Sequence, residues 1–382
     1  MIYLDNNATT LMAPEVLDEM MPFLRGDYGN PSSFHTFGSS VMEQIETARQ
    51  RIASLLGAKP GEIVFNSGGT EGDNNALFSG TSYDSTRPGL VTTAVEHPAV
   101  LETARHFERQ GKPLEVIGVD HGGNLDLDAL RRKTGRTTGL VSVMAANNET
   151  GVLMPLPEAA AIAHGAGALF HTDAVQAVGK VPVDLSVLEA DLLSLSGHKL
   201  HGPKGVGALF VRKGVPFEPL ILGGHQEKGA RAGTYNVAGI VGLGKAAELA
   251  MLHLRNGADR ESALLARLEA GILATCPGAE IAGAASPRLP NTSTVLFTTV
   301  ESEAVLTLLD LQGIYVSSGS ACSTGSKDPS YVLSAMAIGA MQANTAIRFS
   351  LSRYTTEAEI DRLLEVLPPL VARLRAISPY SR

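Results

Sequence analysis

The chain has 382 residues, of which 44% are hydrophobic and 18% charged, and its formal net charge is −8. This length allows two domains with large cores, and the acidic balance gives no general attraction to nucleic acids or acidic membranes. No basic segment followed by an apolar core opens the chain, and no uninterrupted apolar run approaches membrane-spanning length. We therefore expect a cytoplasmic protein that acts on small molecules, with neither nucleic acid nor a membrane as a direct partner.

Short apolar segments alternate with helix-like stretches along much of the chain. Strands are expected at Glu62–Phe65, Leu90–Ala94, Leu114–Val119, Leu140–Met144, Ala168–Thr172, Asp191–Leu195 and Val206–Val211. The helices expected between them include Glu71–Ser79, Ala99–Gln110 and Leu156–His164. This alternation predicts an α/β fold with a mainly parallel sheet covered by helices on both faces. A short glycine-rich link joins the last two strands, so at least this pair can be antiparallel.

The pattern changes after a long helix expected at Ala238–Arg255. Beyond it, a strand and three helices are expected at Ser293–Phe297, Arg260–Thr275, Glu301–Gln312 and Glu357–Arg375. These elements suggest a smaller α+β domain, to which the first residues of the chain return. We therefore expect a large domain at 15–256 and a small domain made of 1–14 and 257–382.

The most informative loop follows the strand that ends at Leu195. It reads Ser196-Gly197-His198-Lys199. Open α/β sheets bind ligands at the carboxyl ends of their strands, and a lysine there can form a Schiff base with an aldehyde cofactor. The hydroxyl, imidazole and backbone donors beside it can hold a phosphate. A lone lysine is more often a solvated surface charge, so other segments must supply the rest of a site.

Two further strand ends carry chemically suitable groups. Asp173 follows the strand that ends at Thr172, and Gln176 comes three residues later. A carboxylate keeps a pyridinium nitrogen protonated, which makes a pyridoxal ring an electron sink, and an amide can donate to the phenolic oxygen of that ring. Alternatively, Asp173 caps a following helix. His97 follows another strand and can stack over a planar cofactor or move protons, although a loop histidine is commonly structural.

A phosphate site is expected where Ser67-Gly68-Gly69-Thr70-Glu71 joins a strand to a helix. The backbone N–H groups around Gly69 and the Thr70 hydroxyl can bind an anion at the positive helix end. The segment lacks the lysine of a P-loop and the spacing of a dinucleotide fingerprint, so nucleotide binding is the weaker interpretation.

The chain has two cysteines, in very different surroundings. Small polar residues flank Cys322, so we expect it in an exposed, mobile loop where a thiolate nucleophile can act. Cys276 is more plausibly structural, like most isolated cysteines. A reducing compartment makes a disulfide unexpected, and two cysteines give no metal site. Farther on, Arg348 lies in an alternating segment and can bind a substrate carboxylate bidentately, whereas Arg353 is expected on the surface.

Taken together, these segments resemble the cysteine desulfurases of the NifS/IscS family. These are pyridoxal-phosphate enzymes of the class V aminotransferase family, with the aspartate aminotransferase-like fold called type I. The resemblance covers nearly the whole chain and includes Tyr3–Thr10, Gly29–Ser33, Ala146–Gly151, His171–Gln176 and Arg348–Glu359. It implies a seven-stranded, mainly parallel sheet in the large domain, and a small domain that carries the catalytic cysteine loop.

The resemblance also implies a role for each site residue. Lys199 would hold pyridoxal 5'-phosphate covalently and remove the Cα proton of L-cysteine, and Cys322 would attack the substrate sulfur. His97 would carry protons, and Asn148 and Arg348 would orient the substrate. The cofactor would be bound by Gly69, Thr70, His97, Asn148, Asp173, Gln176, Ser196, His198, Lys199 and, from the other subunit of a homodimer, Thr234.

The products implied are alanine and a persulfide on Cys322, which passes its sulfur to an acceptor such as an iron–sulfur scaffold protein. An aminotransferase, a selenocysteine lyase or a catalytically silent sulfur-assembly scaffold are the alternatives. The sequence Ser-Ser-Gly-Ser-Ala-Cys before and at Cys322 favours the NifS/IscS branch over the SufS branch. Two residues depart from the family pattern: Tyr235, where Glu or another residue is more usual, and Gly72, where Ser is usual.

Overall fold

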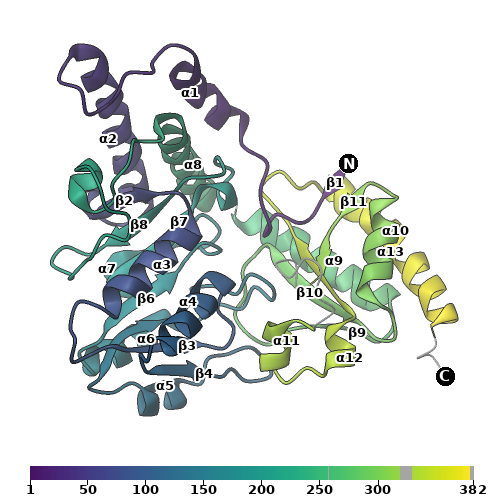
Figure 1. The fold of residues 1–382 in the computed structure, drawn as a ribbon. Coiled ribbons are helices and arrows are strands. Elements are labelled where there is room, and N and C mark those ends of the chain that lie inside the picture. The colour runs from purple at the N-terminus through teal and green to yellow at the C-terminus, as the bar shows by residue number, and fades with distance from the viewer. Residues whose placement is uncertain (257, 319–328, 379–382) are drawn as a thin grey trace.

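The computed structural model describes residues 1–256, 258–318 and 329–378 (Figure 1). Its larger sheet has seven strands in the order β2-β8-β7-β6-β5-β3-β4. They are β2 (Ile63–Asn66), β3 (Gly89–Thr93), β4 (Leu114–Ile117), β5 (Thr138–Ser142), β6 (Leu169–Asp173), β7 (Leu192–Ser196) and β8 (Gly207–Val211). β8 is antiparallel to both its neighbours, and the other pairs are parallel. The expected mainly parallel sheet and its antiparallel pair are therefore confirmed.

Helices cover both faces of this sheet. They are α1 (Pro14–Arg25), α2 (Thr36–Leu56), α3 (Gly69–Gly80), α4 (Pro98–Arg109), α5 (Leu127–Lys133), α6 (Leu156–Gly165), α7 (Leu185–Leu188) and α8 (Val237–Asn256). Leu90 packs with α3 and α4, whereas its neighbour Val91 packs into the core on the opposite face. Neighbouring strand residues point to opposite faces, so a sheet covered on both sides needs continuous apolar strands rather than alternating ones.

The apolar helix α8 lies in this core. Its segment Val237–Arg255, with a mean hydropathy of 1.4, is long and apolar enough to cross a membrane. Lys245 and Glu248 interrupt the apolar run, form an ion pair and contact the neighbouring helices through Glu19 and Arg51. α8 packs along α1 and α2, and 56% of its most apolar window is buried. Its apolar character is thus explained by packing inside the protein.

A smaller antiparallel sheet has the order β12-β13-β10-β9. Its strands are β9 (Ala279–Ile281), β10 (Thr292–Phe297), β12 (Ser317–Ser318) and β13 (Ala346–Ser350). The accompanying helices are α9 (Ala258–Thr275), α10 (Ser302–Asp310), α11 (Tyr331–Ala335), α12 (Ala340–Ala343) and α13 (Glu357–Ile377). Short 3₁₀ turns lie at η1 (Pro60–Glu62), η2 (Gly197–Lys199) and η3 (Gln226–Gly229). The strand and three helices expected beyond Gly257 are confirmed.

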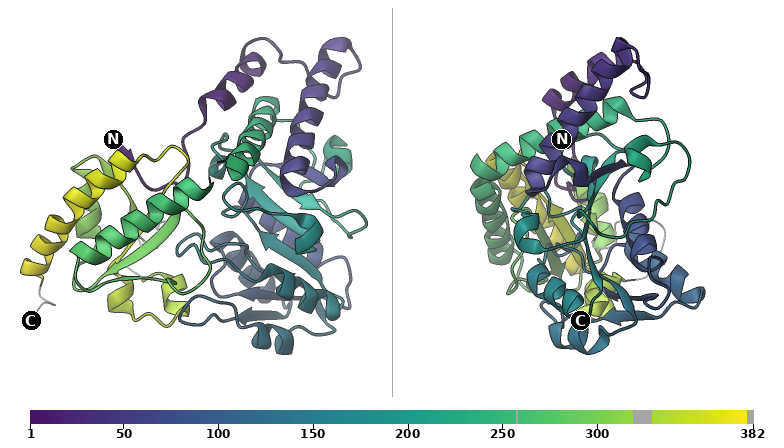
Figure 2. Two further views of the ribbon diagram at one scale, coloured as in Figure 1. Left: turned by 180° about the vertical axis from the view of Figure 1, so that it is seen from behind. Right: turned by 90° about the vertical axis from the view of Figure 1, so that its left-hand side faces the viewer.

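The N-terminus lies beside this second sheet, as expected. β1 (Ile2–Tyr3) pairs in parallel with β11 (Ile314–Tyr315), and Figure 2 shows the N-terminus next to the C-terminal helix α13. The two sheets have largely separate cores, although Leu296 and Val332 pack into the core of the larger one. The exact domain boundary at residues 256 and 257 stays a prediction.

Candidate active site

The predicted site residues gather at one edge of the seven-stranded sheet. Gly69, His97, Asn148 and Lys199 lie beyond the ends of β2, β3, β5 and β7, and Asp173 is the last residue of β6. These strands point the same way, so their carboxyl ends meet at one edge, where open α/β sheets bind ligands.

Lys199 reaches the N-terminal segment of the chain. Its ammonium donates to the carbonyl oxygens of Asn7 and Ala8, the latter at 2.8 Å. The Asn7 N–H also donates to Ser350 Oγ of β13 at 2.9 Å, so this segment links the lysine to the second sheet. Asn7 was not identified from the sequence as a site residue, since a contact across 192 positions leaves no local pattern.

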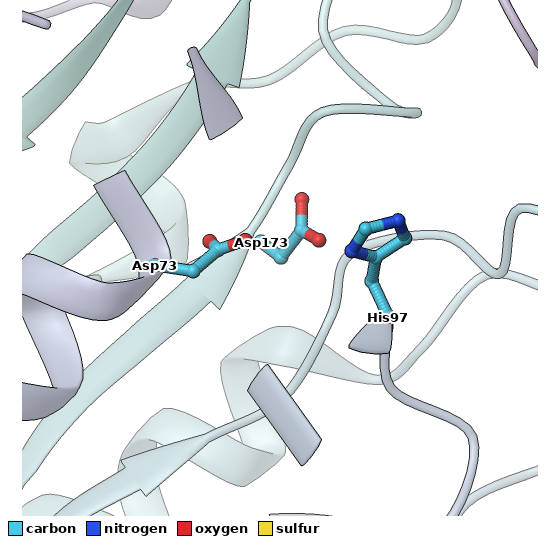
Figure 3. Close-up of side chains that lie close together, drawn as sticks. All are labelled: Asp73, His97 and Asp173. Atoms are coloured by element: carbon cyan, nitrogen blue, oxygen red, sulfur yellow. The ribbon is translucent and has the colours of Figure 1, made fainter. Parts of the chain in front are cut away.

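Asp173 lies at the end of β6, with its carboxylate directed toward the imidazole of His97 (Figure 3). Its Oδ1 accepts a hydrogen bond from the Val175 N–H at 2.9 Å. Turns rather than a helix follow it, so the helix-cap alternative is wrong and the carboxylate closes a turn. Burial raises the pKa of Asp173, while the charges of His97 and Lys199 oppose that rise. A cationic ring nitrogen would favour the charged carboxylate further.

His97 is the N-cap residue of α4, and its Nδ1 accepts from the Ala99 N–H at 3.1 Å. This bond leaves the proton of a neutral ring on Nε2. Burial is the main cause that lowers the pKa of His97; Asp173 raises it and Lys199 lowers it. The lowered pKa favours the neutral ring, whose Nε2–H can donate a hydrogen bond toward the site.

A buried polar group lies behind Asp173 that sequence reasoning missed. Asp73 of α3, His97 and Asp173 place one ligand atom each within 4.8 Å of one another, a spacing that by itself would also suit a cation. The His171 ring, 3.6 Å from Asp73, bonds to the hydroxyls of Ser142 and Ser194 at 2.8 and 3.0 Å. Burial lowers the pKa of His171 to about 3 and, with the nearby Asp173 charge, raises that of Asp73 well above its usual value. His171 is thus uncharged at neutral pH, and burial favours the uncharged form of Asp73 as well.

Gln176 is fixed by two polar contacts. Its Nε2 donates to the Asn7 carbonyl at 3.0 Å, and its Oε1 accepts from the Lys180 ammonium at 2.6 Å. Lys180 also donates to Asn7 Oδ1 at 2.9 Å. Lys180 was not singled out from the sequence, because a lone lysine after Val-Gly gives no signal of burial.

The expected phosphate cradle lies where α3 begins. Gly68, its N-cap residue, has a φ of 148° and supplies no side-chain cap. A Cβ on Gly69 would lie 2.7 Å from Val175 Cγ2, so a larger residue there would displace the Val175 side chain. Within the described parts of the chain, the N–H groups of Gly69 and Thr70 have no hydrogen-bond acceptor. Ser196 is buried beside Gly68, and these donors at a positive helix end suit a phosphate.

His198 points its Nδ1 at the Thr9 hydroxyl, 3.1 Å away. Burial, with the charges of Lys199 and Lys204, lowers the pKa of His198 to about 4. The ring is neutral at physiological pH and can offer a hydrogen bond without a positive charge.

Arg348 lies in β13, and its side chain is 2% exposed. Its Nη1 donates to the Asn148 carbonyl at 3.0 Å and its Nη2 to Asp5 Oδ1 at 2.7 Å. Among the described residues, Arg348 Nε and Asn148 Oδ1 are buried polar atoms with no hydrogen-bond partner. Such orphaned groups are rare in native proteins, and this pair matches the needs of an amino acid substrate. Arg353 is not a plain surface residue, because it donates to the Leu200 carbonyl at 3.0 Å and burial lowers its pKa.

Two of the predicted site residues, Thr234 and Cys322, are not placed by the structure among the residues at this sheet edge. Thr234 is exposed and lines a separate hollow with Ser67, Arg231 and Tyr235. Cys322 lies outside the described residues. On either side of residues 319–328, Ser317 pairs with Arg348 across the small sheet, and Ser330 donates to Glu149 Oε2 at 2.5 Å. Cys276 is 1% exposed, as its structural interpretation requires.

The residues present fit pyridoxal phosphate. A buried carboxylate, a lysine, an amide and an uncapped helix N-terminus lie at one sheet edge, and Arg348 and Asn148 keep unpaired polar atoms beside them. The ring nitrogen of the cofactor would place a cation beside the Asp173 carboxylate. Its phosphate would place an anion at the N-terminus of α3.

Comparisons with known proteins agree with this geometry. Residues 2–363 match the family model described as Aminotransferase class-V. A cysteine desulfurase of Cereibacter sphaeroides is 55% identical, and the alignment covers 99% of this chain and 98% of that protein. The solved structure of a NifS-like protein has a TM-score of 0.91 at 40% identity, covering 98% of this chain and 100% of that one. SspA in complex with cysteine has a TM-score of 0.82 at 32% identity, covering 93% and 100%.

The chain belongs to the class V aminotransferase family of pyridoxal-phosphate enzymes with the type I fold. Within that family its full-length relatives are cysteine desulfurases of the NifS-like group, and the enzyme is a pyridoxal-phosphate-dependent cysteine desulfurase. The family, fold and cofactor implied by the sequence motifs are confirmed.

Proposed function

We propose that this enzyme removes the sulfur of L-cysteine, releases alanine and leaves a persulfide on Cys322. The observation that carries the proposal is the pair of unpartnered buried atoms, Arg348 Nε and Asn148 Oδ1, at the sheet edge that holds Lys199 and Asp173. SspA, a structural relative, was solved in complex with cysteine. An amino acid offers the carboxylate and ammonium groups that these two atoms can bind.

The residues divide the work as follows. Bound pyridoxal phosphate supplies an aldehyde for Lys199 and an electron sink for the substrate's Cα. Asp173 holds the proton on the ring nitrogen, Gln176 donates to the phenolic oxygen, and Thr70, Ser196, His198 and the N–H groups near Gly69 hold the phosphate. Arg348 binds the substrate carboxylate, and Lys199 moves the Cα proton.

His97 and Cys322 carry out the sulfur chemistry. His97 carries the substrate thiol proton and returns a proton to carbon; to accept a proton, its Nδ1 must first release the hydrogen bond from the Ala99 N–H. The Cys322 thiolate attacks the substrate sulfur, so that an S–S bond forms while the Cβ–S bond breaks. The electron pair of the broken bond stays on carbon, which takes up a proton and leaves as alanine.

A homodimer with shared sites is part of the proposal. Large apolar side chains are strongly exposed, namely Leu11, Leu24, Tyr28, Phe34 and Leu222, with Phe34 fully exposed at 105%. Exposed apolar groups of this size are characteristic of interfaces. Thr234 is exposed and lacks a contact with the site of its own chain within the described residues, which suits a ligand to the partner subunit's phosphate. We propose the cytoplasm as compartment and an iron–sulfur scaffold protein as an acceptor.

The proposal is tested by incubating the holoenzyme with L-cysteine while measuring alanine, sulfide released by reductant, and the mass of the Cys322 peptide. We expect alanine together with one added sulfur atom on that peptide. Cys322→Ala should keep the cofactor and lose sulfur transfer, whereas Cys276→Ala, the matched control, should retain both. Alanine without added sulfur on Cys322, or unchanged turnover in Cys322→Ala, contradicts the proposal and favours a lyase or an aminotransferase.

A further inference from the structure

The loop that carries Thr234 contains an unusual turn. Between β8 and α8, Glu227 and Lys228 have φ values of 48° and 57°, and Gly229 follows with a φ of 87°. Left-handed backbone is unfavourable for residues with a Cβ atom, and it persists only where the surroundings impose it. Two such residues in succession therefore need contacts that hold them.

The side chain of Glu227 supplies the first of these contacts. It is nearly buried, and its carboxylate pairs with Arg49 of α2 through two bonds of 2.7 and 2.8 Å. Its Oε2 also accepts from the Phe65 N–H of β2 at 2.9 Å. Arg49 in turn donates to the Ile63 carbonyl at 2.7 Å. The turn is thus fixed to the rigid sheet through a buried, two-pronged ion pair.

The turn then holds both neighbours of Thr234. The Glu227 N–H donates to the Tyr235 hydroxyl at 2.9 Å, and the Gly233 N–H donates to Gln226 Oε1 at 3.1 Å. Thr234 lies between these two bonds, although its own side chain is exposed. Tyr235, a position where the family resemblance leads us to expect another residue, makes its hydroxyl contact inside this loop.

A third contact ties the same loop to the phosphate cradle. Arg231 Nε lies 2.9 Å from Glu71 Oε1, and the other oxygen of Glu71 accepts from the Ser67 N–H at 3.0 Å. Glu71 directly follows Thr70 in α3. The loop is therefore held on one side by the Glu227 turn and on the other by the first turn of the helix that binds phosphate.

We propose that Tyr235 and Glu227 are positioning residues that hold Thr234 in the geometry needed to bind the cofactor phosphate of the partner subunit. This inference rests on the proposed homodimer. Tyr235 does not touch the cofactor of either subunit; it acts through the backbone of Thr234. Loss of its hydroxyl frees the loop without altering Lys199, Asp173 or Arg348.

The test is equilibrium binding of pyridoxal phosphate to the apo dimer, followed by absorbance. Tyr235→Phe should raise the Kd about five-fold, the effect of one net hydrogen bond. Thr234→Ala should raise it comparably, and the double variant should show little further loss, because the two changes remove one contact. Tyr83→Phe, a tyrosine outside this loop, should leave the Kd unchanged. Gln226→Leu removes the bond from the Gly233 N–H and should raise the Kd as Tyr235→Phe does. It serves as the second variant if Tyr235→Phe folds poorly.

Mixed dimers separate this role from general stability. In a heterodimer with one Lys199→Ala subunit, Tyr235→Phe placed in that subunit should weaken cofactor binding by the intact lysine of its partner. The same change in the lysine-bearing subunit should have no effect there. Equal effects in both placements, a fully additive double variant or an unchanged Kd overturns the inference. If the wild-type chain is monomeric or binds no pyridoxal phosphate, the proposed function itself fails.

Discussion

The side-chain oxygen of Gln176 accepts a hydrogen bond from the Lys180 ammonium at 2.6 Å. The oxygen and nitrogen of a glutamine amide are similar in shape, so a neighbouring cation decides which of them faces it. Lys180 therefore turns the Gln176 NH₂ group toward the Asn7 carbonyl and the site. Burial, followed by the charge of Lys199, lowers the pKa of Lys180 to about 7.

Replacement of Lys180 by methionine should reduce kcat/KM about ten-fold, because the Gln176 amide can then turn its oxygen toward the phenolic oxygen of the cofactor. The pH at which the cofactor absorbance changes should shift as well, since a cation near Lys199 is removed. Steady-state kinetics and a spectroscopic pH titration measure both. Lys213→Met, an exposed lysine, is the control, and equal behaviour of the two variants contradicts the orientation argument.

Asp173→Asn and Asp73→Asn form a matched pair of buried carboxylate changes. Asp173 must be charged to hold a ring proton, so its asparagine variant should lose about 100-fold or more in kcat. Burial, together with the Asp173 charge, raises the pKa of Asp73 well above its usual value, which favours its protonated form. Its asparagine variant should therefore stay within about three-fold of the wild type.

Both variants are to be loaded with cofactor and compared by single-turnover release of alanine. A larger loss in Asp73→Asn than in Asp173→Asn would show that Asp73, rather than Asp173, carries the charge in the working enzyme.

Strand-end chemistry was predictable from the sequence because it is local. Apolar runs such as Leu192–Leu195 mark buried parallel strands, and the groups just beyond them, Asp173 and Lys199, are brought together by strand direction alone. The alternative that Asp173 caps a following helix was wrong, since the carboxylate turns back onto the Val175 N–H. Both outcomes depend on only a few neighbouring residues.

The residues that sequence reasoning missed act across long separations. Asp73 reaches His171 from a helix that packs over the sheet, and Asn7 reaches Lys199 from the start of the chain. Alternation along β6 places His171 on the same face of the sheet as Asp173. This alternation is the one sequence signal that would have identified His171. No periodicity marks Lys180, because its burial is set by the segment around Asn7.

Glu96 should make the free energy of unfolding depend on pH. It is fully buried in the loop after β3, and burial raises its pKa to about 8, despite bonds from the Met144 N–H and the Thr93 hydroxyl. A carboxyl whose pKa is raised on folding contributes stability below its unfolded pKa, and this is lost as pH rises through the folded value. Wild-type stability should therefore fall between about pH 4.5 and 8.

Glu96→Gln should remove this pH-dependent loss in the free energy of unfolding. The loss amounts to a few kcal/mol, at about 1.4 kcal/mol per unit of pKa shift. The amide keeps the oxygen that accepts both bonds and mimics the protonated acid. Urea unfolding at several pH values measures the effect, with the exposed Glu102→Gln as control. A variant with the same slope as the wild type would mean that Glu96 is charged in the folded protein.

Arg348→Lys should raise the KM for L-cysteine about 10- to 100-fold, with a smaller change in kcat. The planar guanidinium of Arg348 bonds Asn148 and Asp5 and still leaves Nε for a substrate carboxylate. A lysine ammonium cannot reproduce this arrangement. Arg353→Lys is the matched control, because Arg353 is a partly buried arginine that donates to the Leu200 carbonyl rather than to Asn148 or Asp5. Equilibrium binding of L-alanine, the product with the same carboxylate, should weaken in parallel with KM. A raised KM with unchanged alanine binding would show that Arg348 does not bind the substrate carboxylate.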